Sequence, residues 1–374
     1  MPRYLTPFVL QDLKRKMIFI GGPRQVGKTT FAKDMGKGWP GGSQYFNWDN
    51  TTHRDDILHH HLPAEPNQLI ILDEIHKYGR WRNLVKGLHD VNAERGVRYC
   101  VTGSARLDLY RRGGDSLQGR YHYYRLHPFS LKEAGGGRQV LENLFLHSGF
   151  PEPFFAAQAD FTRRWSKEYR TRVMQEDVRD LENVRDLSLM ELLATRLPAL
   201  VGSPLSFNGL REDIQVAHRT ISRWVDILER MYFIFRIYPY GSSKLRAVKK
   251  EAKHYHYDWS VVTDEGIRFE NMVANHLLKW CHFTEDTAGH EMELRYFRDV
   301  DKREVDFVVL RDGKAELFVE VKLSAQEPTP ALRYLKERHV KVRAVQVHLR
   351  GEDDYVSREG IAVMPAEKFL MELI

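Results

Sequence analysis

The sequence has very little cysteine: Cys100 and Cys281 are the only two among 374 residues. They lie far apart and neither has metal-ligand spacing, which argues against a disulfide framework or a cysteine zinc site and favours a reducing compartment. Long apolar runs are also missing, since no stretch approaches the roughly 18 residues that a membrane-spanning helix needs. The first residues lack the apolar segment of a secretory signal. We therefore expect a cytoplasmic protein with no membrane partner.

Acidic residues are slightly fewer than basic ones, with 51 Asp and Glu against 57 Lys and Arg, which gives a formal net charge of +6. A basic balance is compatible with a nucleic-acid partner, but an ordinary protein with a small excess of Lys and Arg would give the same value. The length favours two or three domains over one.

Three regions of the chain differ in pattern, and together they predict an α/β protein. Residues 1–135 alternate short apolar runs with helical stretches, as in a P-loop ATPase with a parallel sheet. Residues 140–245 are mainly helical and predict a lid-like domain. Residues 250–374 mix helices with strands, including a hairpin around the turn at 311–314. The strands expected in the first region are 17–20, 45–48, 69–72, 99–102 and 121–126.

A glycine-rich loop follows the first apolar run and opens a helix. Its sequence matches G-x-x-x-x-G-K-[ST] at every fixed position, which is the pattern of a P-loop that binds ATP with Mg²⁺. Backbone N–H groups would face the phosphates, Lys28 would contact the β- and γ-phosphates, and Thr29 would place its hydroxyl on the metal. The expected nucleotide-binding residues are Gly22, Pro23, Arg24, Gln25, Val26, Gly27, Lys28, Thr29 and Thr30.

Two carboxylates follow the apolar run at 69–72. Asp73 is expected to hold the metal through its coordinated water, and Glu74 to orient and polarise the attacking water. A buried strand that merely ends in two exposed acids would show the same letters. The complete P-loop upstream favours the catalytic interpretation.

The next two strands supply further candidates for the ATP site. Ser104, with Thr102 as second choice, is expected to contact the γ-phosphate or the lytic water, although Ser and Gly also favour plain turns. Arg120 is the candidate arginine finger for a neighbouring subunit. A solvated surface arginine is the alternative, and three other arginines compete for the role: Arg106, Arg111 and Arg112.

The middle region contains a helix–turn–helix pattern followed by an apolar run at 233–238, which is typical of a winged helix. On that interpretation Arg219 and Arg223 project from a recognition helix toward DNA. Winged-helix domains also serve as packing lids that touch no DNA, and the sequence leaves both open.

The last region holds a second group of candidate catalytic residues. Glu320 and Lys322 share one face of an expected strand, and counting back through the hairpin turn sets Asp306 nearly opposite Glu320. Two carboxylates suit Mg²⁺ or Mn²⁺, the lysine could help activate a water, and Glu270 is a further candidate ligand. A hairpin with a solvated charged face is the alternative. Against it, Asp306 and Glu320 interrupt apolar strands, where unpaired carboxylates are costly.

The chain as a whole resembles a prokaryotic family with an N-terminal AAA+ type ATPase, a winged-helix-like middle and a C-terminal restriction-endonuclease-like domain of the PD-(D/E)xK kind. The matching segments are GGPRQVGKTT at 21–30, LDEIHK at 72–77, TGSAR at 102–106, GR at 119–120, LHPFSLKE at 126–133, EVDF at 304–307 and EVK at 320–322. Val305 stands where the family usually has proline. The resemblance implies oligomerisation and a role on DNA.

These observations favour an ATP-hydrolysing, DNA-processing protein with a metal-dependent nuclease-like domain, for which branched DNA is one candidate substrate. Two alternatives stay open: a nucleotide-switched DNA-binding ATPase whose nuclease-like site is silent, and a signalling ATPase that acts on protein partners. The protein partner, the preferred DNA and the oligomer number do not follow from the sequence.

Overall fold

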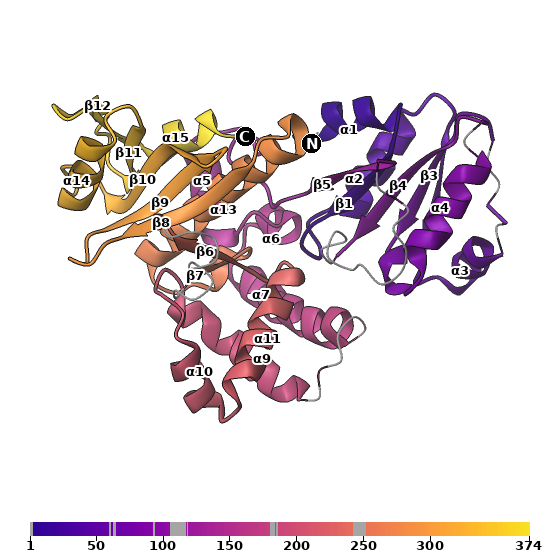
Figure 1. The fold of residues 1–374 in the computed structure, drawn as a ribbon, viewed down its shortest axis with the longest axis horizontal. Helices are drawn as coiled ribbons and strands as arrows, with labels where there is room; N and C mark the ends of the chain where they lie inside the picture. The colour runs from indigo at the N-terminus through magenta and orange to yellow at the C-terminus, as the bar shows by residue number, and fades with distance from the viewer. Residues whose placement is uncertain are drawn as a thin grey trace. The chain divides into compact units, whose positions relative to one another are not determined.

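The structure is a computed structural model that describes residues 3–59, 61–62, 65–92, 94–104, 117, 119–179, 184, 186–241 and 252–374 (Figure 1). Its internal contacts divide the chain into two units. The first contains Met1–His127, Gln175–Val184 and Arg230–Tyr232; the second contains Pro128–Met174, Arg185–Glu229 and Phe233–Ile374. The expected middle and C-terminal domains fall together in the second unit, and the division into three domains stays a prediction.

The first unit is built on a five-stranded parallel sheet with the order β2-β3-β4-β1-β5. All five strands lie where the apolar runs predicted them, which confirms the α/β expectation for this region. Their bounds are β1 Met17–Gly21, β2 Ser43–Asn47, β3 Leu69–Asp73, β4 Arg98–Gly103 and β5 Tyr121–Arg125.

Burial explains why these short runs form a parallel sheet. Every residue of β1 and β3 is buried, as expected when helices cover both faces of a sheet. The core packs Phe19 and Leu72 with Trp81 and Val85. The helices of this unit are α1 (Thr6–Leu13), α2 (Lys28–Lys37), α3 (Thr51–Leu58), η1 (Ile75–Lys77) and α4 (Trp81–Asn92).

Helices come first in the second unit. They are α5 (Arg138–His147), α6 (Pro151–Ala156), α7 (Ala159–Arg172), α9 (Leu187–Arg196), η3 (Leu197–Leu200), α10 (Phe207–Ile214) and α11 (His218–Arg230). A π-helical turn, η2 (Val173–Val178), continues α7, and its last residues belong to the first unit. None of the described helices is long and apolar enough to cross a membrane.

An eight-stranded mixed sheet with the order β12-β13-β11-β10-β9-β8-β6-β7 dominates the second unit. Its strands are β6 (Ile234–Pro239), β7 (Lys253–His256), β8 (Met292–Arg298), β9 (Glu304–Arg311), β10 (Lys314–Ser324), β11 (Arg343–Arg350), β12 (Tyr355–Val356) and β13 (Ile361–Pro365). Four helical elements accompany them: η4 (Trp259–Val261), α13 (Glu265–Ala288), α14 (Pro330–Arg338) and α15 (Ala366–Glu372).

The strand expected to form the wing of a winged helix belongs to this large sheet. β6 pairs antiparallel with β7 at residues 234–237 and parallel with β8 at Tyr238 and Pro239, so it connects these two strands within the large sheet. The two helices of the pattern are present as α10 and α11. The winged-helix interpretation stays a prediction.

Candidate functional site

The P-loop runs from the end of β1 to the start of α2 in a conformation that requires its glycines. Gly22 has φ of +152° and Gly27 has φ of +95°, values that side chains rarely adopt. A Cβ on Gly22 would lie 2.2 Å from the carbonyl oxygen of Leu126. The loop can therefore pass close to the end of β5 only because residue 22 has no side chain.

Lys28, the first residue of α2, is buried beside this loop. Its Nζ donates hydrogen bonds to the carbonyl oxygens of Gly22, at 2.9 Å, and Pro23, at 2.7 Å. Burial lowers the pKa of Lys28, and the charges of Glu74 and Asp73 oppose that shift. A buried ammonium whose hydrogen-bond partners are neutral carbonyls suits an anionic phosphate, so the loop fits the nucleotide that the motif implies.

Asp73, at the end of β3, is a centre of hydrogen bonding. Its Oδ2 accepts from the Thr29 hydroxyl at 2.7 Å and from the Tyr45 hydroxyl at 2.7 Å, while its Oδ1 accepts from Thr102. The carboxylate and the Thr29 hydroxyl, the two groups expected to hold Mg²⁺, are thus in direct contact. An oxygen-rich pair of this kind suits a hard cation. Tyr45 is a neighbour that the sequence patterns did not single out.

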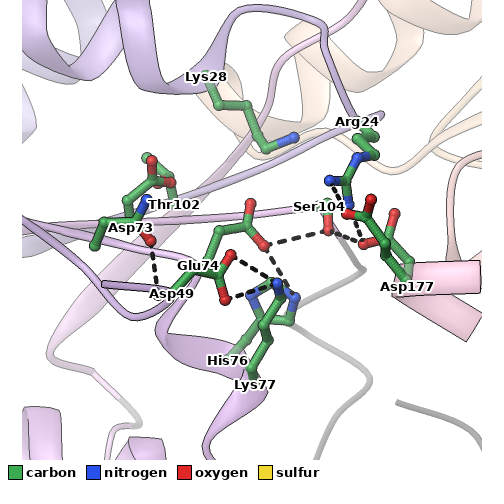
Figure 2. A network of polar contacts seen from close by, with 12 residues as sticks. Arg24, Lys28, Asp49, Asp73, Glu74, His76, Lys77, Thr102, Ser104 and Asp177 are labelled. Carbon is green, nitrogen blue, oxygen red and sulfur yellow. Dashed lines mark hydrogen bonds and ion pairs between the residues drawn. The ribbon is translucent and has the colours of Figure 1, made fainter. Parts of the chain in front are cut away.

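Glu74 follows Asp73 in a left-handed backbone conformation, with φ of 58°, and its side chain is 19% exposed. Its Oε2 lies 3.5 Å from the Ser104 hydroxyl and 3.8 Å from Nε2 of His76 (Figure 2). Burial raises the pKa of Glu74, with Lys28 opposing the rise. Burial also lowers the pKa of His76 to about 4, so a neutral imidazole faces the carboxyl group near neutral pH.

Asp177 is a site residue that the sequence analysis missed. Its Oδ1 accepts hydrogen bonds from Ser104 Oγ at 3.0 Å and from Arg24 Nη1 at 2.9 Å (Figure 2). Its other carboxylate oxygen is buried without a hydrogen-bond partner among the described residues. Burial raises the pKa of Asp177, although Arg24 opposes the rise. A sequence signal existed: Asp177 stands four residues after Val173 and eight after Tyr169, on the apolar face of a helical pattern.

The candidate arginine finger, Arg120, lies just before β5. Its Nε is 3.4 Å from Asp90 Oδ1, and its side chain is 39% exposed. Its role stays a prediction. Three competing arginines lie outside the residues that the structure describes: Arg106, Arg111 and Arg112.

In the second unit, Asp306 on β9 and Glu320 on β10 are opposite each other in the register, since the adjacent residues Phe307 and Val319 are paired. Asp306 Oδ2 accepts a hydrogen bond from the backbone N–H of Val321 at 2.8 Å. This register agrees with the count back through the hairpin turn.

Glu320 is buried, and its Oε1 lies 2.7 Å from Lys322 Nζ. Within the described part of the chain, its Oε2 is buried without a hydrogen-bond partner. Burial and the nearby charge of Asp306 raise the pKa of Glu320 to about 8, although Lys322 opposes the rise. The free oxygen of Glu320 and the neighbouring carboxyl group of Asp306 fit a divalent cation. A bound cation would favour the ionised form of both carboxyl groups.

Glu270, on α13, is held by residues that the sequence analysis did not assign to the site. Its Oε1 accepts a hydrogen bond from the Tyr255 hydroxyl at 2.7 Å and lies 3.8 Å from Lys253 Nζ. The buried Lys253 also pairs with Glu304 at 2.5 Å. Burial and Asp306 raise the pKa of Glu270 to about 7. Lys253 and Tyr255 are two residues apart on β7 and therefore lie on the same face of the strand. This spacing was the sequence signal that could have placed them together.

Within the described ranges, no group of three or more His, Cys, Asp or Glu residues is arranged to hold a metal ion. The pair formed by Asp306 and Glu320 therefore carries the metal prediction without Glu270 as a third ligand. The two arginines expected to contact DNA, Arg219 and Arg223, are exposed one turn apart on α11.

Comparison with known protein families divides the chain into three consecutive matches. An AAA domain matches residues 14–135, a domain of unknown function (DUF8612) matches 138–264, and a second domain of unknown function (DUF4143) matches 265–369. The first match, the parallel sheet and the P-loop together support a P-loop ATPase fold for this part of the chain. The other two matches assign no activity.

Similar proteins of nearly full length exist in distant organisms. Uncharacterized protein MJ1637 of Methanocaldococcus jannaschii is 22% identical over 97% of this chain and 86% of its own length. Uncharacterized protein Rv2008c of Mycobacterium tuberculosis is 23% identical over 95% of this chain and 81% of its own. In both relatives the sequence similarity therefore extends over nearly the whole of this chain.

Among solved structures, the RuvB Holliday junction branch migration motor of Thermotoga maritima has a TM-score of 0.30 at 16% identity, covering 62% of this chain and 87% of that one. The ORC1 protein of Aeropyrum pernix in complex with DNA has a TM-score of 0.35 at 14% identity, covering 72% and 89%. These similarities are too low to support an inference about function.

Proposed function

We propose that this protein hydrolyses ATP and acts on DNA, and that its ATP cycle is coupled to a metal-dependent nuclease-like site in the second unit. The observation that carries the proposal is the convergence of Lys28, Thr29, Asp73 and Glu74 at one edge of the parallel sheet. The opposed carboxylates Asp306 and Glu320 support the second half of the proposal.

In the first unit each residue has a distinct task. Lys28 and the backbone N–H groups of the loop would bind the phosphates, while Thr29 and Asp73 would hold Mg²⁺, which would supply positive charge to stabilise the phosphates. Glu74 orients the water whose oxygen forms the new bond to phosphorus as the bond to the β-phosphate oxygen breaks. Ser104, which already contacts Glu74, is in reach of the same region.

Asp177 gives this site a carboxyl group close to where a γ-phosphate would develop negative charge. Its contacts with Arg24 and Ser104 would compete with contacts between those residues and the nucleotide. Arg120 remains the candidate for an arginine finger, and with it we propose a homo-oligomer in which one subunit completes its neighbour's site.

In the second unit the proposed reaction is hydrolysis of a phosphodiester bond. Asp306 and Glu320 would hold Mg²⁺ or Mn²⁺, which would supply charge stabilisation at the scissile phosphate. Lys322, 2.7 Å from Glu320, would help to position the attacking water. Glu270 acts here through Tyr255 and Lys253 as part of the polar surroundings of the pair.

A cleavage panel tests the nuclease half. Purified protein would be incubated with single-stranded, duplex, forked and four-way-junction DNA, with Mg²⁺ or Mn²⁺, with and without ATP. The informative variants are Asp306→Ala and Glu320→Ala, and Glu316→Ala is a matched control on the same strand because Glu316 pairs with Arg311 away from the proposed metal. We expect cleavage that both informative variants lose and the control keeps.

Two other outcomes decide between the alternatives. Binding of DNA that depends on ATP, without cleavage under any metal, would assign the carboxylates to structure and leave a nucleotide-switched DNA-binding ATPase. That alternative is favoured by the engagement of Glu320 with Lys322 and of Glu270 with Tyr255. Absence of any DNA binding would contradict the DNA role and favour a signalling ATPase with protein partners.

A further inference from the structure

A cavity of about 560 Å³ lies within the second unit, between α7 and the start of α13. Four basic side chains line it: Arg163, Lys167, Arg170 and Arg268. Among the described residues that line it, none carries a carboxylate. The cavity shares none of its lining residues with the Asp306 and Glu320 pair.

Three of these cations form one stripe, because residues four and three apart lie on the same face of a helix. Arg163 leads the stripe and forms an ion pair with the exposed Asp160. Lys167 and Arg170 have no ion-pair partner in the part of the chain that the structure describes. Two unneutralised positive charges on one helix turn repel each other, so this face favours an anionic ligand.

Arg268 approaches from the other wall and is held in place. Its Nε donates a hydrogen bond to the carbonyl oxygen of Val262 at 2.7 Å, and its guanidinium lies 5.5 Å from the centre of the Phe145 ring. A fixed guanidinium loses little conformational freedom when it binds a phosphate, which makes it a good anchor.

The hydroxyl groups at the floor have another task. Ser166 Oγ donates to Asp258 Oδ2 at 2.7 Å, and Ser260 Oγ donates to Asp258 Oδ1 at 2.6 Å. Because both hydroxyl groups donate their protons to the buried Asp258, they are not available as donors to a ligand. Recognition of a ligand therefore depends on the four basic side chains.

The lining suits phosphates and offers little to bases. The one ring among the described lining residues is the imidazole of His147, which is buried and hydrogen-bonded to Thr162 Oγ1, so the lining offers no exposed stacking platform for a nucleobase. The seven steps from Arg163 to Arg170 along the helix advance by about 10 Å at about 1.5 Å per residue. Phosphates of one DNA strand recur every ~3.4 Å along the duplex axis, so the stripe extends over about three of them.

We infer that this cavity binds the phosphodiester backbone of DNA without reading its bases. The inference rests on the proposed role on DNA and adds the surface that grips the strand. Arg219 and Arg223, the residues that the sequence favoured for DNA contact, lie on a different helix and do not line the cavity.

The test is fluorescence anisotropy of labelled single-stranded and duplex DNA with the full chain, in EDTA to prevent cleavage, over a range of salt concentrations. The informative variant combines Lys167→Glu with Arg170→Glu. Its control combines Arg164→Glu with Arg172→Glu, which changes the net charge equally on the same helix but outside the cavity lining. A milder pair, Lys167→Ala with Arg170→Ala, guards against misfolding, and thermal unfolding is recorded for every variant.

We expect the informative variant to bind DNA about tenfold or more weakly than the wild type, and the control variant to stay within about twofold of it. For the alanine pair, the slope of log affinity against log salt concentration should become shallower by about 0.7 to 0.9 for each phosphate contact that is lost. Equal affinities in the informative and control variants would overturn this inference and leave the DNA role intact. No DNA binding by the wild-type chain would overturn both. A free polyphosphate is the other ligand with this chemistry, and calorimetry with tripolyphosphate tests it while ADP and Mg²⁺ fill the P-loop. If the cavity variants lose tripolyphosphate binding but bind DNA as the wild type does, the ligand of the cavity is a free polyphosphate and not DNA.

Discussion

Replacement of Glu320 by glutamine should make the protein more stable at alkaline pH when no divalent metal is present. Glu320 is buried in β10, and Asp306 lies opposite it. One of its carboxylate oxygens has no hydrogen-bond partner in the ranges that the structure describes. Burial and Asp306 raise its pKa to about 8 from an ordinary 4.5. The unfolded chain ionises this group near its ordinary pKa, whereas the folded chain resists ionisation.

The sign follows from proton binding. Between about pH 4.5 and 8 the folded state holds the proton that the unfolded state has released, so the free energy of unfolding falls as pH rises through this window. One pKa unit corresponds to about 1.36 kcal/mol, and the two pKa values therefore imply up to about 5 kcal/mol. Loss of the ion pair with Lys322 offsets part of this gain in the variant. We expect a net relative stabilisation of about 2 kcal/mol or more at about pH 9 compared with about pH 5.

The assay is urea unfolding of the wild type and Glu320→Gln in EDTA at about pH 5 and about pH 9. Glu316→Gln, on the same strand, is the control and should follow the wild type at both pH values. Adding Mn²⁺ at alkaline pH should stabilise the wild type and leave Glu320→Gln unchanged, because the metal would compensate the ionised pair. Parallel pH profiles for the wild type and Glu320→Gln would refute the reasoning.

Three further predictions concern other parts of the molecule. Gly22→Ala places a Cβ 2.2 Å from the carbonyl oxygen of Leu126 at a φ of +152°. We expect the free energy of unfolding to fall by about 1–3 kcal/mol and nucleotide binding to weaken. An unchanged melting curve would contradict the close approach of the loop to Leu126. Asp177→Asn removes a buried carboxylate near Lys28, so ATP should bind several-fold more tightly in a fluorescent-nucleotide titration while ADP changes less; equal gains for both nucleotides would argue against an effect at the γ-phosphate. Burial lowers the pKa of His254 to about 4, so its contribution to stability is fully present above the ordinary pKa of 6.5 and is lost as pH falls toward 4, where the unfolded chain binds the proton first. His254→Gln should reduce the acid sensitivity by up to about 3 kcal/mol relative to an exposed-site variant, His290→Gln, and the idea fails if both variants lose stability alike.

The first unit could be predicted well because its signals are local. The apolar runs of β1 and β3 are short, continuous and bounded by turn residues, which is how a strand buried on both faces reads in a sequence. The P-loop follows one run and Asp73 follows the other. Parallel strands bring their carboxyl ends to one edge of the sheet, so proximity of these groups followed from the pattern.

The contacts that were missed connect residues far apart in the chain. Arg24 and Asp177 are separated by 153 positions, and nothing in the periodicity of either segment specifies the other. The pairing of β6 with β8 is similar, since the strand at 234–239 read alone is equally compatible with a wing or with a larger sheet. Burial of Lys253 beside Glu270 likewise depends on how β7 packs against α13.

The most direct test of the account is the rate of phosphate release from ATP by the wild type and by Glu74→Gln, each with and without DNA. The account predicts that the wild type hydrolyses ATP at a rate that DNA changes, and that Glu74→Gln still binds ATP with Mg²⁺ but hydrolyses it about 10²-fold or more slowly. Equal rates for the two proteins would contradict the assignment of Glu74 as the residue that activates water. A wild-type rate that DNA leaves unchanged would contradict the coupling of the ATP cycle to DNA.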